Sequence, residues 1–371
     1  MSSTARLGAA GARAVLGTLR QRTRSRIRPL ALIVAAGCFL VLGPREVARA
    51  AGDGALRGDG STLVYPLMRK WISEYEKVSG ITVAYEPNGS GKGISDMTDR
   101  SVDFGCSDNP MSDEEIKQAT KVGGPVVHVP LTLGAVAPIY NLPDVKERLG
   151  FSGRLLARIF LGQLHRWNDP ELQALNPGVP LPDHEIAVVH RLDSSGTTYV
   201  WTEYLSKVSP EWQSAVGLGK TVPWPLGLAA KGNEGVAGLV KQTPWSIGYA
   251  QVTYGIRESL EYGWVENAAG EFVEPLPVAI TAAAESLMTK LPEDLRFSIT
   301  NGPGLGSFPI STVTWALAYT TPPDGKGRQL GDFLRWIIHY GQEYGEALDF
   351  APLPQPLVDR GEAMVRGLAD H

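Results

Sequence analysis

The most informative segment of this sequence is His190-Arg191-Leu192-Asp193-Ser194-Ser195-Gly196-Thr197-Thr198. It follows the apolar run 186–189 and precedes the helix-like segment 199–208, so we expect a strand that turns into a helix. A helix start offers unpaired backbone N–H groups and a positive dipole end, and here Arg191 and several hydroxyls accompany them. These groups suit an oxyanion. An ordinary Ser/Thr cap, with Arg191 paired to Asp193 at the surface, has the same pattern and is the commoner arrangement.

The first fifty residues have the layout of an export signal. Residues 1–28 contain arginines and no acidic residue, 30–42 are apolar, and Ala48-Arg49-Ala50 is a small-residue cleavage site. This apolar run is too short to span a bilayer. We therefore expect a signal peptide over 1–50, cleavage near Ala50 and a periplasmic protein. A lipid anchor at Cys38 is the less favoured alternative, because Cys38 lies inside the apolar run.

The rest of the chain is acidic. The 371 residues contain 35 basic and 39 acidic side chains, of which nine basic and one acidic lie in residues 1–50. The remaining 26 basic and 38 acidic residues give a net formal charge of −12. An acidic body argues against nucleic acid or an anionic membrane as a partner. A bound anion must therefore be held by local dipoles and by one or two cations.

The cysteine and histidine patterns give no sign of a metal site or a cofactor. Cys106 is the only cysteine after residue 50, so no internal disulfide and no zinc or iron–sulfur pattern can form there. The six histidines are scattered without ligand spacing. We expect no cofactor, no metal and a monomeric protein.

Strand-like and helix-like segments alternate from Ala55 to the end of the chain, which predicts an α/β fold with largely parallel sheets. Gly58-Asp59-Gly60-Ser61-Thr62 precedes a helix expected to reach Ser79, with Gly80 as the residue that ends it. Asn88-Gly89-Ser90-Gly91-Lys92-Gly93 leads to a short helix expected over 94–100. A final helix is expected over 330–344, from its apolar spacing.

Asp108 follows a short strand expected within 101–107 and precedes a helix that starts near Ser112. From this segment alone, Asp108 either caps that helix or faces a ligand. Turns rich in glycine and hydroxyls near Thr62, Ser90 and Ser195 each open a helix. Ligands of open α/β sheets bind beyond the carboxyl ends of the strands, where such turns face one another. The three turns together therefore predict a shared anion site.

These segments resemble the periplasmic phosphate-binding proteins of ABC-type phosphate importers. The matching segments lie between Gly58 and about Asp349, in the family's order and spacing: 58–63 with Lys70-Trp71, 89–93, 102–108, 161–167, 176–178, 187–198, 231–233 and 247–249. The resemblance implies a two-lobed type II binding-protein fold, with two mixed, largely parallel sheets flanked by helices and a hinge of two crossing strands. It implies lobe 1 over 51–132 and 309–371 and lobe 2 over 133–308, with crossings near 130–136 and 307–313.

The resemblance also implies the function. The chain is expected to capture inorganic phosphate and deliver it to the permease and ATPase subunits of an ABC importer, without enzymatic activity. The family's phosphate ligands carry over to Thr62, Leu63, Ser90, Asp108, Arg191, Ser195, Gly196 and Thr197, and Asp193 matches the acid that holds the arginine. Leu63 stands where the family usually has Phe, and Lys92 brings a charge that either attracts the anion or faces solvent.

Asp108 is the residue that points to phosphate among oxyanions. A carboxylate repels an anion unless the ligand brings a proton to donate. Mono- and dibasic phosphate carry such a proton, whereas sulfate at neutral pH does not. A site built around a ligand O–H rejects an analogue that lacks it. The sequence therefore predicts selectivity for phosphate over sulfate.

Two other kinds of function remain open. The nearer one is a binder of another tetrahedral oxyanion, such as arsenate, or a phosphate scavenger or sensor unconnected to transport. The distant one is a phosphohydrolase, which needs a nucleophile and a base. Ser195 lacks the flanking glycine of G-x-S-x-G because position 193 is Asp. His190, on a strand, is expected to point opposite to Arg191.

Overall fold

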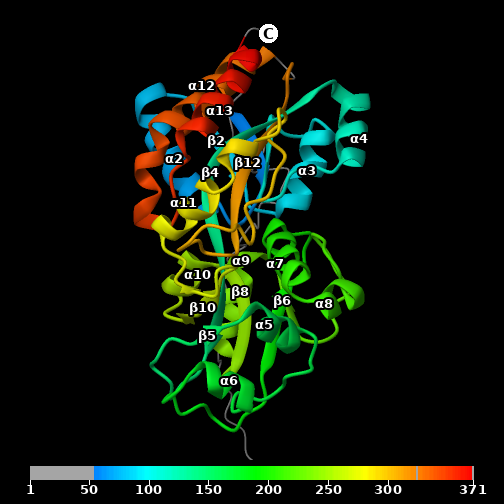
Figure 1. Cartoon of the computed structure of the whole chain (residues 1–371). Helices are drawn as coiled ribbons and strands as arrows, with labels where there is room; N and C mark the ends of the chain where they lie inside the picture. The colour runs from blue at the N-terminus through cyan, green and yellow to red at the C-terminus, as the bar shows by residue number, and fades with distance from the viewer. Residues whose placement is uncertain (1–53, 323–324, 370–371) are drawn as a thin grey trace, which may run out of the picture.

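The structure is a computed structural model that describes residues 54–322 and 325–369. The expected export signal, with its cleavage site at Ala50 and with Cys38, lies outside the described residues. Two lobes are stacked in Figure 1: the upper one contains the beginning and the end of the described chain, and the lower one contains its green middle segments. Within the described ranges, no helix combines the length and the apolar composition needed to cross a bilayer.

The long strand β4 (Val126–Asn141) connects the sheets of the two lobes. Up to Ala135 it pairs with β12, and from Val136 onward it pairs with β8. The strand order is β2-β1-β3-β12-β4-β8-β6-β7, with β9 also paired to β4, and β11-β10-β5 form a separate sheet. The other strands are β1 (Leu56–Gly60), β2 (Val83–Glu86), β3 (Phe104–Ser107), β5 (Gly150–Phe151), β6 (Ala187–Arg191), β7 (Leu228–Ala230), β8 (Ser246–Gln251), β9 (Glu261–Tyr262), β10 (Trp264–Glu266), β11 (Phe272–Val273) and β12 (Ser311–Tyr319).

Helices cover the sheets of both lobes (Figure 1). They are α2 (Tyr65–Ser79), α3 (Ser90–Thr98), α4 (Asp113–Gly123), α5 (Gly153–Phe160), α6 (Pro170–Leu175), α7 (Gly196–Val208), α8 (Pro210–Ala215), α9 (Gly232–Gln242), α10 (Val252–Arg257), α11 (Pro277–Glu285), α12 (Gly327–His339) and α13 (Gln355–Ala369), with short 3-10 helices η1 (Met288–Lys290), η3 (Gly341–Tyr344) and η4 (Glu346–Leu348). Parallel ladders join β1 to β2 and β3, and β6 to β7 and β8, whereas the ladders of β4 and β12 are antiparallel. The predicted two-lobed α/β fold with mixed sheets is confirmed.

Helix α2 ends at Ser79, as predicted. Apolar residues at three- and four-residue spacing form its buried face, and Gly80 ends it with a left-handed φ of 71°. The final helix differs from the prediction: α12 ends at His339, and η3 follows. The Trp71 indole N–H donates to the carbonyl of Gly341 (2.7 Å), and a Cβ at Gly341 would lie 2.8 Å from that nitrogen. Glycine at position 341 therefore allows η3, which follows α12, to approach Trp71 of α2 closely.

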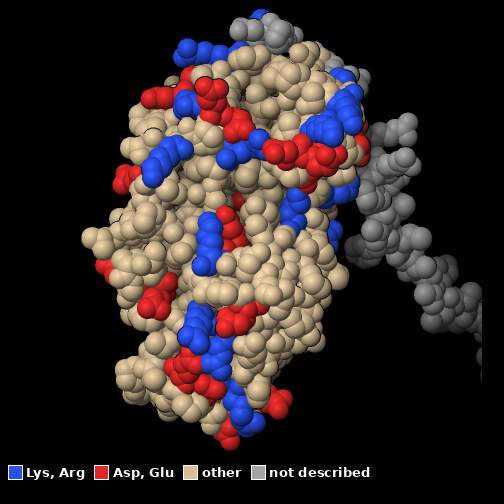
Figure 2. Space-filling view, turned by 45° about the vertical axis from the view of Figure 1, so that its right-hand side comes forward, with Lys and Arg blue, Asp and Glu red and all other residues tan. Residues whose placement is uncertain are grey.

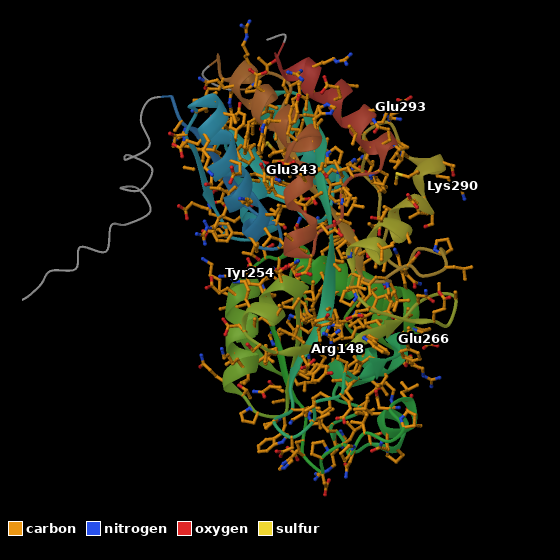
Figure 3. The ribbon with its side chains drawn as sticks, turned by 90° about the vertical axis from the view of Figure 1, so that its left-hand side faces the viewer. Arg148, Tyr254, Glu266, Lys290, Glu293 and Glu343 are labelled. Carbon is orange, nitrogen blue, oxygen red and sulfur yellow. The ribbon has the colours of Figure 1, made fainter. Side chains whose placement is uncertain are left out.

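Residues 277–300 lie beside the first lobe, although they precede the return strand β12. Helix α11 packs against β4 and β12. The Arg360 guanidinium of α13 donates to the carbonyls of Pro292 and Glu293, at 3.0 Å each. Figure 3 shows Lys290 and Glu293 in the upper half of the molecule, near the end of the chain. The lobe bounds expected from the sequence stay a prediction.

A buried ion pair ties the start of α12 to the first sheet. The Asp103 side chain is 1% exposed, and its Oδ2 accepts from the Lys326 ammonium (3.0 Å) and from the backbone N–H of Arg57 (2.7 Å). The same ammonium donates to the carbonyl of Ala55. Removing one partner of such a pair leaves a buried charge without compensation.

We predict that Lys326→Met lowers the free energy of unfolding by about 3 kcal/mol or more, because Asp103 stays buried without its cation. The matched control is Lys77→Met, which breaks an exposed pair with Glu74 and is expected to cost about 1 kcal/mol or less. Urea unfolding of both variants measures the difference. Equal losses in the two variants would contradict the prediction.

Burial also raises the pKa of a carboxyl group on β1. Asp59 is 4% exposed, its Oδ2 accepts from the Asn88 amide (2.8 Å), and its Oδ1 has no partner among the described residues. Burial raises the pKa of Asp59 to about 6, more than the Asn88 hydrogen bond lowers it. The folded chain therefore holds this proton more tightly than the unfolded chain does, and the stability that it contributes is lost as the pH rises through about 6.

We predict that Asp59→Asn flattens the pH dependence of stability. Between about pH 4 and about pH 7, the free energy of unfolding should fall less in this variant than in the wild-type protein. Asp144→Asn, which changes an exposed aspartate, is the control and should run parallel to wild type. Urea unfolding at several pH values provides the measurement, and parallel curves for Asp59→Asn and wild type would contradict the prediction.

Candidate anion-binding site

The predicted site residues follow the ends of three strands that meet where the lobes touch. Thr62 and Leu63 come after β1, Asp108 directly follows β3, and Arg191 is the last residue of β6. Ser90 begins α3, and Ser195 caps α7. The structure thus brings residues from widely separated parts of the chain to one place at the junction of the lobes.

The turn after β1 presents the Thr62 hydroxyl to the second lobe. Thr62 is 6% exposed, and its Oγ1 accepts from the Asn233 side-chain amide at 2.7 Å. The Tyr254 hydroxyl of α10 donates to the Thr62 carbonyl at 2.6 Å, at the lobe junction seen in Figure 3. The backbone N–H of Leu63, one of the predicted ligand residues, donates here to the Ser61 hydroxyl oxygen (3.0 Å). Its side chain is fully buried.

Helix α3 begins earlier than expected, at Ser90 instead of 94, because Gly89 turns the chain with a φ of 99°. This places the buried Ser90 hydroxyl within the first turn of the helix. Ser90 Oγ lies 3.3 Å from Asp108 Oδ2 and accepts from the Asp108 backbone N–H at 3.2 Å. Lys92 forms an ion pair with Asp96, with about half of its side chain exposed. Of the two possibilities for Lys92, the structure places it toward solvent.

Asp108 is buried and does not cap α4. That helix is capped by Ser112, which forms a capping box with Glu115. The Asp108 Oδ1 atom accepts from two hydroxyls, Ser61 at 2.5 Å and Thr314 at 2.8 Å. Burial raises the pKa of Asp108, against the opposing effect of these hydrogen bonds and of the Arg191 charge. The carboxylate is therefore held among donors within the site.

Arg191 is a buried cation, in contrast to the surface pair of the commoner arrangement. Its side chain is 1% exposed and makes a forked pair with Asp193, Nε to Oδ1 at 2.9 Å and Nη2 to Oδ2 at 2.5 Å. Burial acts to raise the pKa of Asp193, but Arg191 holds it below its ordinary value. The Nη1 atom of Arg191 is buried without a partner among the described residues. One donor of the guanidinium is thus unused by the protein.

Helix α7 starts at Gly196, three residues before the expected position, because Ser195 is its N-cap. The Ser195 hydroxyl oxygen accepts from the Thr198 N–H (3.0 Å), while its backbone N–H donates to the carbonyl of Lys220. A Cβ at Gly196 would lie 2.2 Å from Ser90 Oγ and 2.8 Å from Asp108 Oδ2. Glycine is therefore required for the start of α7 to approach the first lobe.

Sequence reasoning missed three residues of this cluster. Asn233 joins Thr62 to Thr197, with its amide nitrogen 3.0 Å from Thr197 Oγ1. Its segment was recognised only as part of the family resemblance. Ser61 and Thr314 bind Asp108 Oδ1. Thr314 lies 206 residues from Asp108 in the chain, and only the pairing of β12 with β3 brings them together.

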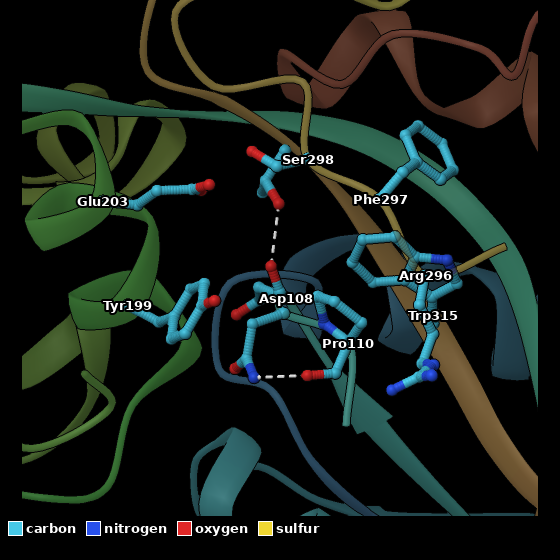
Figure 4. Close-up of a pocket in the computed structure, with 10 residues that line it drawn as sticks. Asp108, Pro110, Tyr199, Glu203, Arg296, Phe297, Ser298 and Trp315 are labelled. Carbon is cyan, nitrogen blue, oxygen red and sulfur yellow. Dashed lines mark hydrogen bonds between the residues drawn. The ribbon is translucent and has the colours of Figure 1, made fainter. Parts of the chain in front are cut away.

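A cavity of about 210 Å³ borders this cluster at Asp108 (Figure 4). Tyr199 and Glu203 of α7 line one side of it, and Asp108, Arg296 and Trp315 lie opposite. Because the two sides come from different lobes, the cavity lies in the cleft between them.

Figure 2 shows Lys and Arg side chains beside Asp and Glu on the molecular surface, with most of the face formed by other residues.

The geometry gives Ser195 no catalytic partner. No histidine or carboxylate hydrogen bonds to Ser195 Oγ within the part of the chain that the structure describes. The His190 ring stacks on Trp224, with the ring centroids 4.8 Å apart. Cys106 is buried, and burial raises the pKa of its thiol. Among residues 54–322 and 325–369, no cluster of His, Cys, Asp and Glu could hold a metal ion.

Comparison with known proteins identifies the family. Residues 46–339 match the model of the PBP superfamily domain. The phosphate-binding protein PstS of Haemophilus influenzae is 40% identical over 322 residues, which cover 86% of this chain and 94% of that protein. The protein of the same name from Methanocaldococcus jannaschii is 35% identical, over 78% of this chain and 79% of that protein.

Solved structures agree with this fold. A periplasmic phosphate-binding protein solved with phosphate (PfluDING) superposes with a TM-score of 0.67 at 21% identity, covering 83% of this chain and 93% of that one. The phosphate-binding protein from Stenotrophomonas maltophilia gives a TM-score of 0.64 at 20% identity, with the same coverage. The resemblance found in the sequence is confirmed by the curated relatives. The chain therefore belongs to the PBP superfamily and, within it, to the family of the phosphate-binding proteins PstS.

Proposed function

We propose that this chain captures inorganic phosphate between its two lobes and delivers it to the permease and ATPase subunits of an ABC-type importer. The observation that carries the proposal is the buried cluster of Thr62, Ser90, Asp108, Arg191 and Thr197, in which one carboxylate stands among hydroxyl and guanidinium donors. The relatives are named as phosphate-binding proteins, which favours binding over catalysis for this chain. Several of its residues have donors that the protein itself does not use.

A dehydrated anion needs many donors, because an unpaired buried charge costs far more than a single hydrogen bond contributes. The cluster offers the unused Nη1 of Arg191 and the hydroxyls of Thr62 and Thr197, which donate to no other described residue. The first turn of α7 adds backbone N–H groups and the positive end of the helix dipole. Asp193 holds the guanidinium fork in place. We propose these groups as phosphate ligands, together with Ser90, Ser195, Gly196 and the turn at Leu63.

Asp108 supplies the selectivity in this proposal. Its Oδ1 already accepts from Ser61 and Thr314, whereas Oδ2 has only the long contact with Ser90. Oδ2 is therefore the atom available to accept a proton from the ligand. Phosphate retains such a proton at neutral pH and sulfate does not. A sulfate ion would place oxygen lone pairs against this carboxylate.

Export and lobe closure complete the proposal. We propose cleavage near Ala50 and action in the periplasm as a monomer. We also propose lobes over 51–132 with 309–371 and over 133–308, with residues 277–300 beside the first lobe. Closure on the ion buries it, and the two lobes together then form a joined surface for the permease. The acidic composition after residue 50 leaves the attraction for phosphate to the buried groups of the site.

The direct test is calorimetric titration of the chain without residues 1–50, after unfolding and dialysis have removed any bound phosphate. We predict one phosphate per chain, and a loss of affinity of about a hundredfold or more in Arg191→Met, since truncating one partner of a buried charged pair is costly. Arg166→Met is the matched control, because Arg166 pairs with Asp183 on the surface. No heat from phosphate in the wild-type protein would refute the proposal, and equal losses in the two variants would place the site elsewhere.

A second prediction concerns sulfate. The wild-type protein should prefer phosphate to sulfate by about 10⁴-fold or more. Asp108→Asn should weaken this preference by at least about a hundredfold, because an amide N–H in place of Oδ2 favours an unprotonated oxygen. Competition titrations measure both ratios. Equal affinities in wild type, or an Asn variant that binds phosphate unchanged and still excludes sulfate, would contradict this role.

The pH dependence of sulfate binding is an independent check of the same role. Because burial raises the pKa of Asp108, this carboxyl takes up a proton at a higher pH than an ordinary aspartate does. A protonated Asp108 can donate to sulfate. Sulfate affinity should therefore rise in the wild-type protein as the pH falls, and should change less in Asp108→Asn.

A further inference from the structure

Asn233 links the two lobes through two threonine hydroxyls. It is fully buried in the first turn of α9, and its side-chain nitrogen lies 2.7 Å from Thr62 Oγ1 and 3.0 Å from Thr197 Oγ1. Thr62 belongs to the first lobe and Thr197 to the second. A single amide group therefore touches one proposed phosphate ligand from each lobe.

The orientation of this amide is fixed by a third partner. The Asn233 side-chain oxygen accepts from the backbone N–H of Gln251 at 2.9 Å. A backbone N–H can only donate, so the oxygen must face Gln251 and the NH₂ group must face the threonines. The two hydrogens of this group thus go to the two threonine hydroxyls.

This arrangement determines what each hydroxyl can do. A hydroxyl has one proton and two lone pairs. Thr62 Oγ1 accepts from Asn233 twice, from its side-chain amide at 2.7 Å and from its backbone N–H at 3.3 Å, and Thr197 Oγ1 accepts once, from the same side-chain amide. Neither hydroxyl donates to any other residue that the structure describes, and both are at least nine-tenths buried. Their protons are free for a further acceptor.

We propose that Asn233 is a positioning residue that makes the hydroxyls of Thr62 and Thr197 donors to phosphate. The inference rests on the proposed function. The site then contains both donors and an acceptor for the ligand. Asn233 orients two hydroxyls to donate to unprotonated oxygens of phosphate, and Asp108 accepts from the protonated oxygen. Because one amide binds a threonine of each lobe, the orientation is complete only when the lobes are closed.

The alternative role for Asn233 is purely mechanical, as a hydrogen-bonded connection between the lobes. Asn233→Asp separates the two roles, because a carboxylate still bonds both threonines and Gln251 but can only accept. The hydroxyls must then donate to the carboxylate and turn their lone pairs toward the anion. Phosphate affinity should fall by about a hundredfold or more, because two hydrogen bonds to the charged ligand are lost.

The added negative charge would also repel phosphate, so a second substitution is needed. In the wild-type background, Thr197→Val removes a donor and should weaken phosphate binding by about tenfold. In the Asn233→Asp background it removes a misdirected lone pair, so it should tighten phosphate binding. Mechanical connection or simple repulsion predicts that Thr197→Val weakens binding in both backgrounds. Calorimetry and intrinsic tryptophan fluorescence, with phosphate titrated into the millimolar range, measure all four chains.

Asn141→Leu is the matched control, because Asn141 donates to the carbonyls of Val240 and Lys241 at the other end of α9. It should leave phosphate affinity unchanged. Weakening by Thr197→Val in both backgrounds, or no recovery of measurable binding by Thr197→Val in the Asn233→Asp background, would overturn the inference. If wild-type protein itself does not bind phosphate, the proposed function fails instead, so the two failures are distinct.

Discussion

The site depends on a carboxylate that is buried among hydroxyl groups. Asp108 interacts with Ser61 after β1, Ser90 at the start of α3 and Thr314 on β12. Each of these hydroxyls comes from a different element, so satisfying this one charge fixes the relative positions of three parts of the first lobe. Burial acts to neutralise the carboxyl, and the hydroxyls and Arg191 act to keep it ionised. The balance of these effects gives the site an acceptor where every neighbouring group is a donor.

The second lobe contributes the Arg191 cation and the remaining hydrogen-bond donors of the site. Its contacts with the first lobe include hydrogen bonds: Tyr254 donates to the Thr62 carbonyl at 2.6 Å, and the Gly91 N–H donates to the Ser194 carbonyl at 3.1 Å. An ion pair joins Lys220, in the segment after α8, to Glu115 of the capping box of α4. Separating polar contacts of this kind costs less free energy than separating an apolar interface, because water can replace the hydrogen-bond partners. Such an interface suits lobes that open and close.

Much of the fold and part of the site could be predicted from the sequence. Local signals were sufficient to predict where α2 ends, because its apolar spacing stops before Gly80. They were also sufficient to predict the turns at Ser90 and Ser195, where hydroxyls follow strands. The starts of α3 and α7 were expected too late, because glycines and hydroxyls in their first turns resemble loop residues. Thr314 and Asn233 carry no local signal, since their roles exist only where distant strands meet. Just beyond the end of α12 at His339, the Gly341 carbonyl accepts from Trp71 of another helix, a contact that the local sequence does not reveal.

The change of partner along β4 has a mechanical consequence. Ala135 pairs with β12 of one lobe, and Val136 pairs with β8 of the other. A strand can bend between two ladders with less disruption than within either one, so this peptide is the natural pivot of the molecule. Rotation there would carry Arg191, Gly196 and Thr197 away together from Ser90 and Asp108. Each half of the molecule would then retain only part of the proposed ligand set, and a dehydrated ion left on one half would have to regain water. Release of the ion would therefore accompany bending at this one peptide.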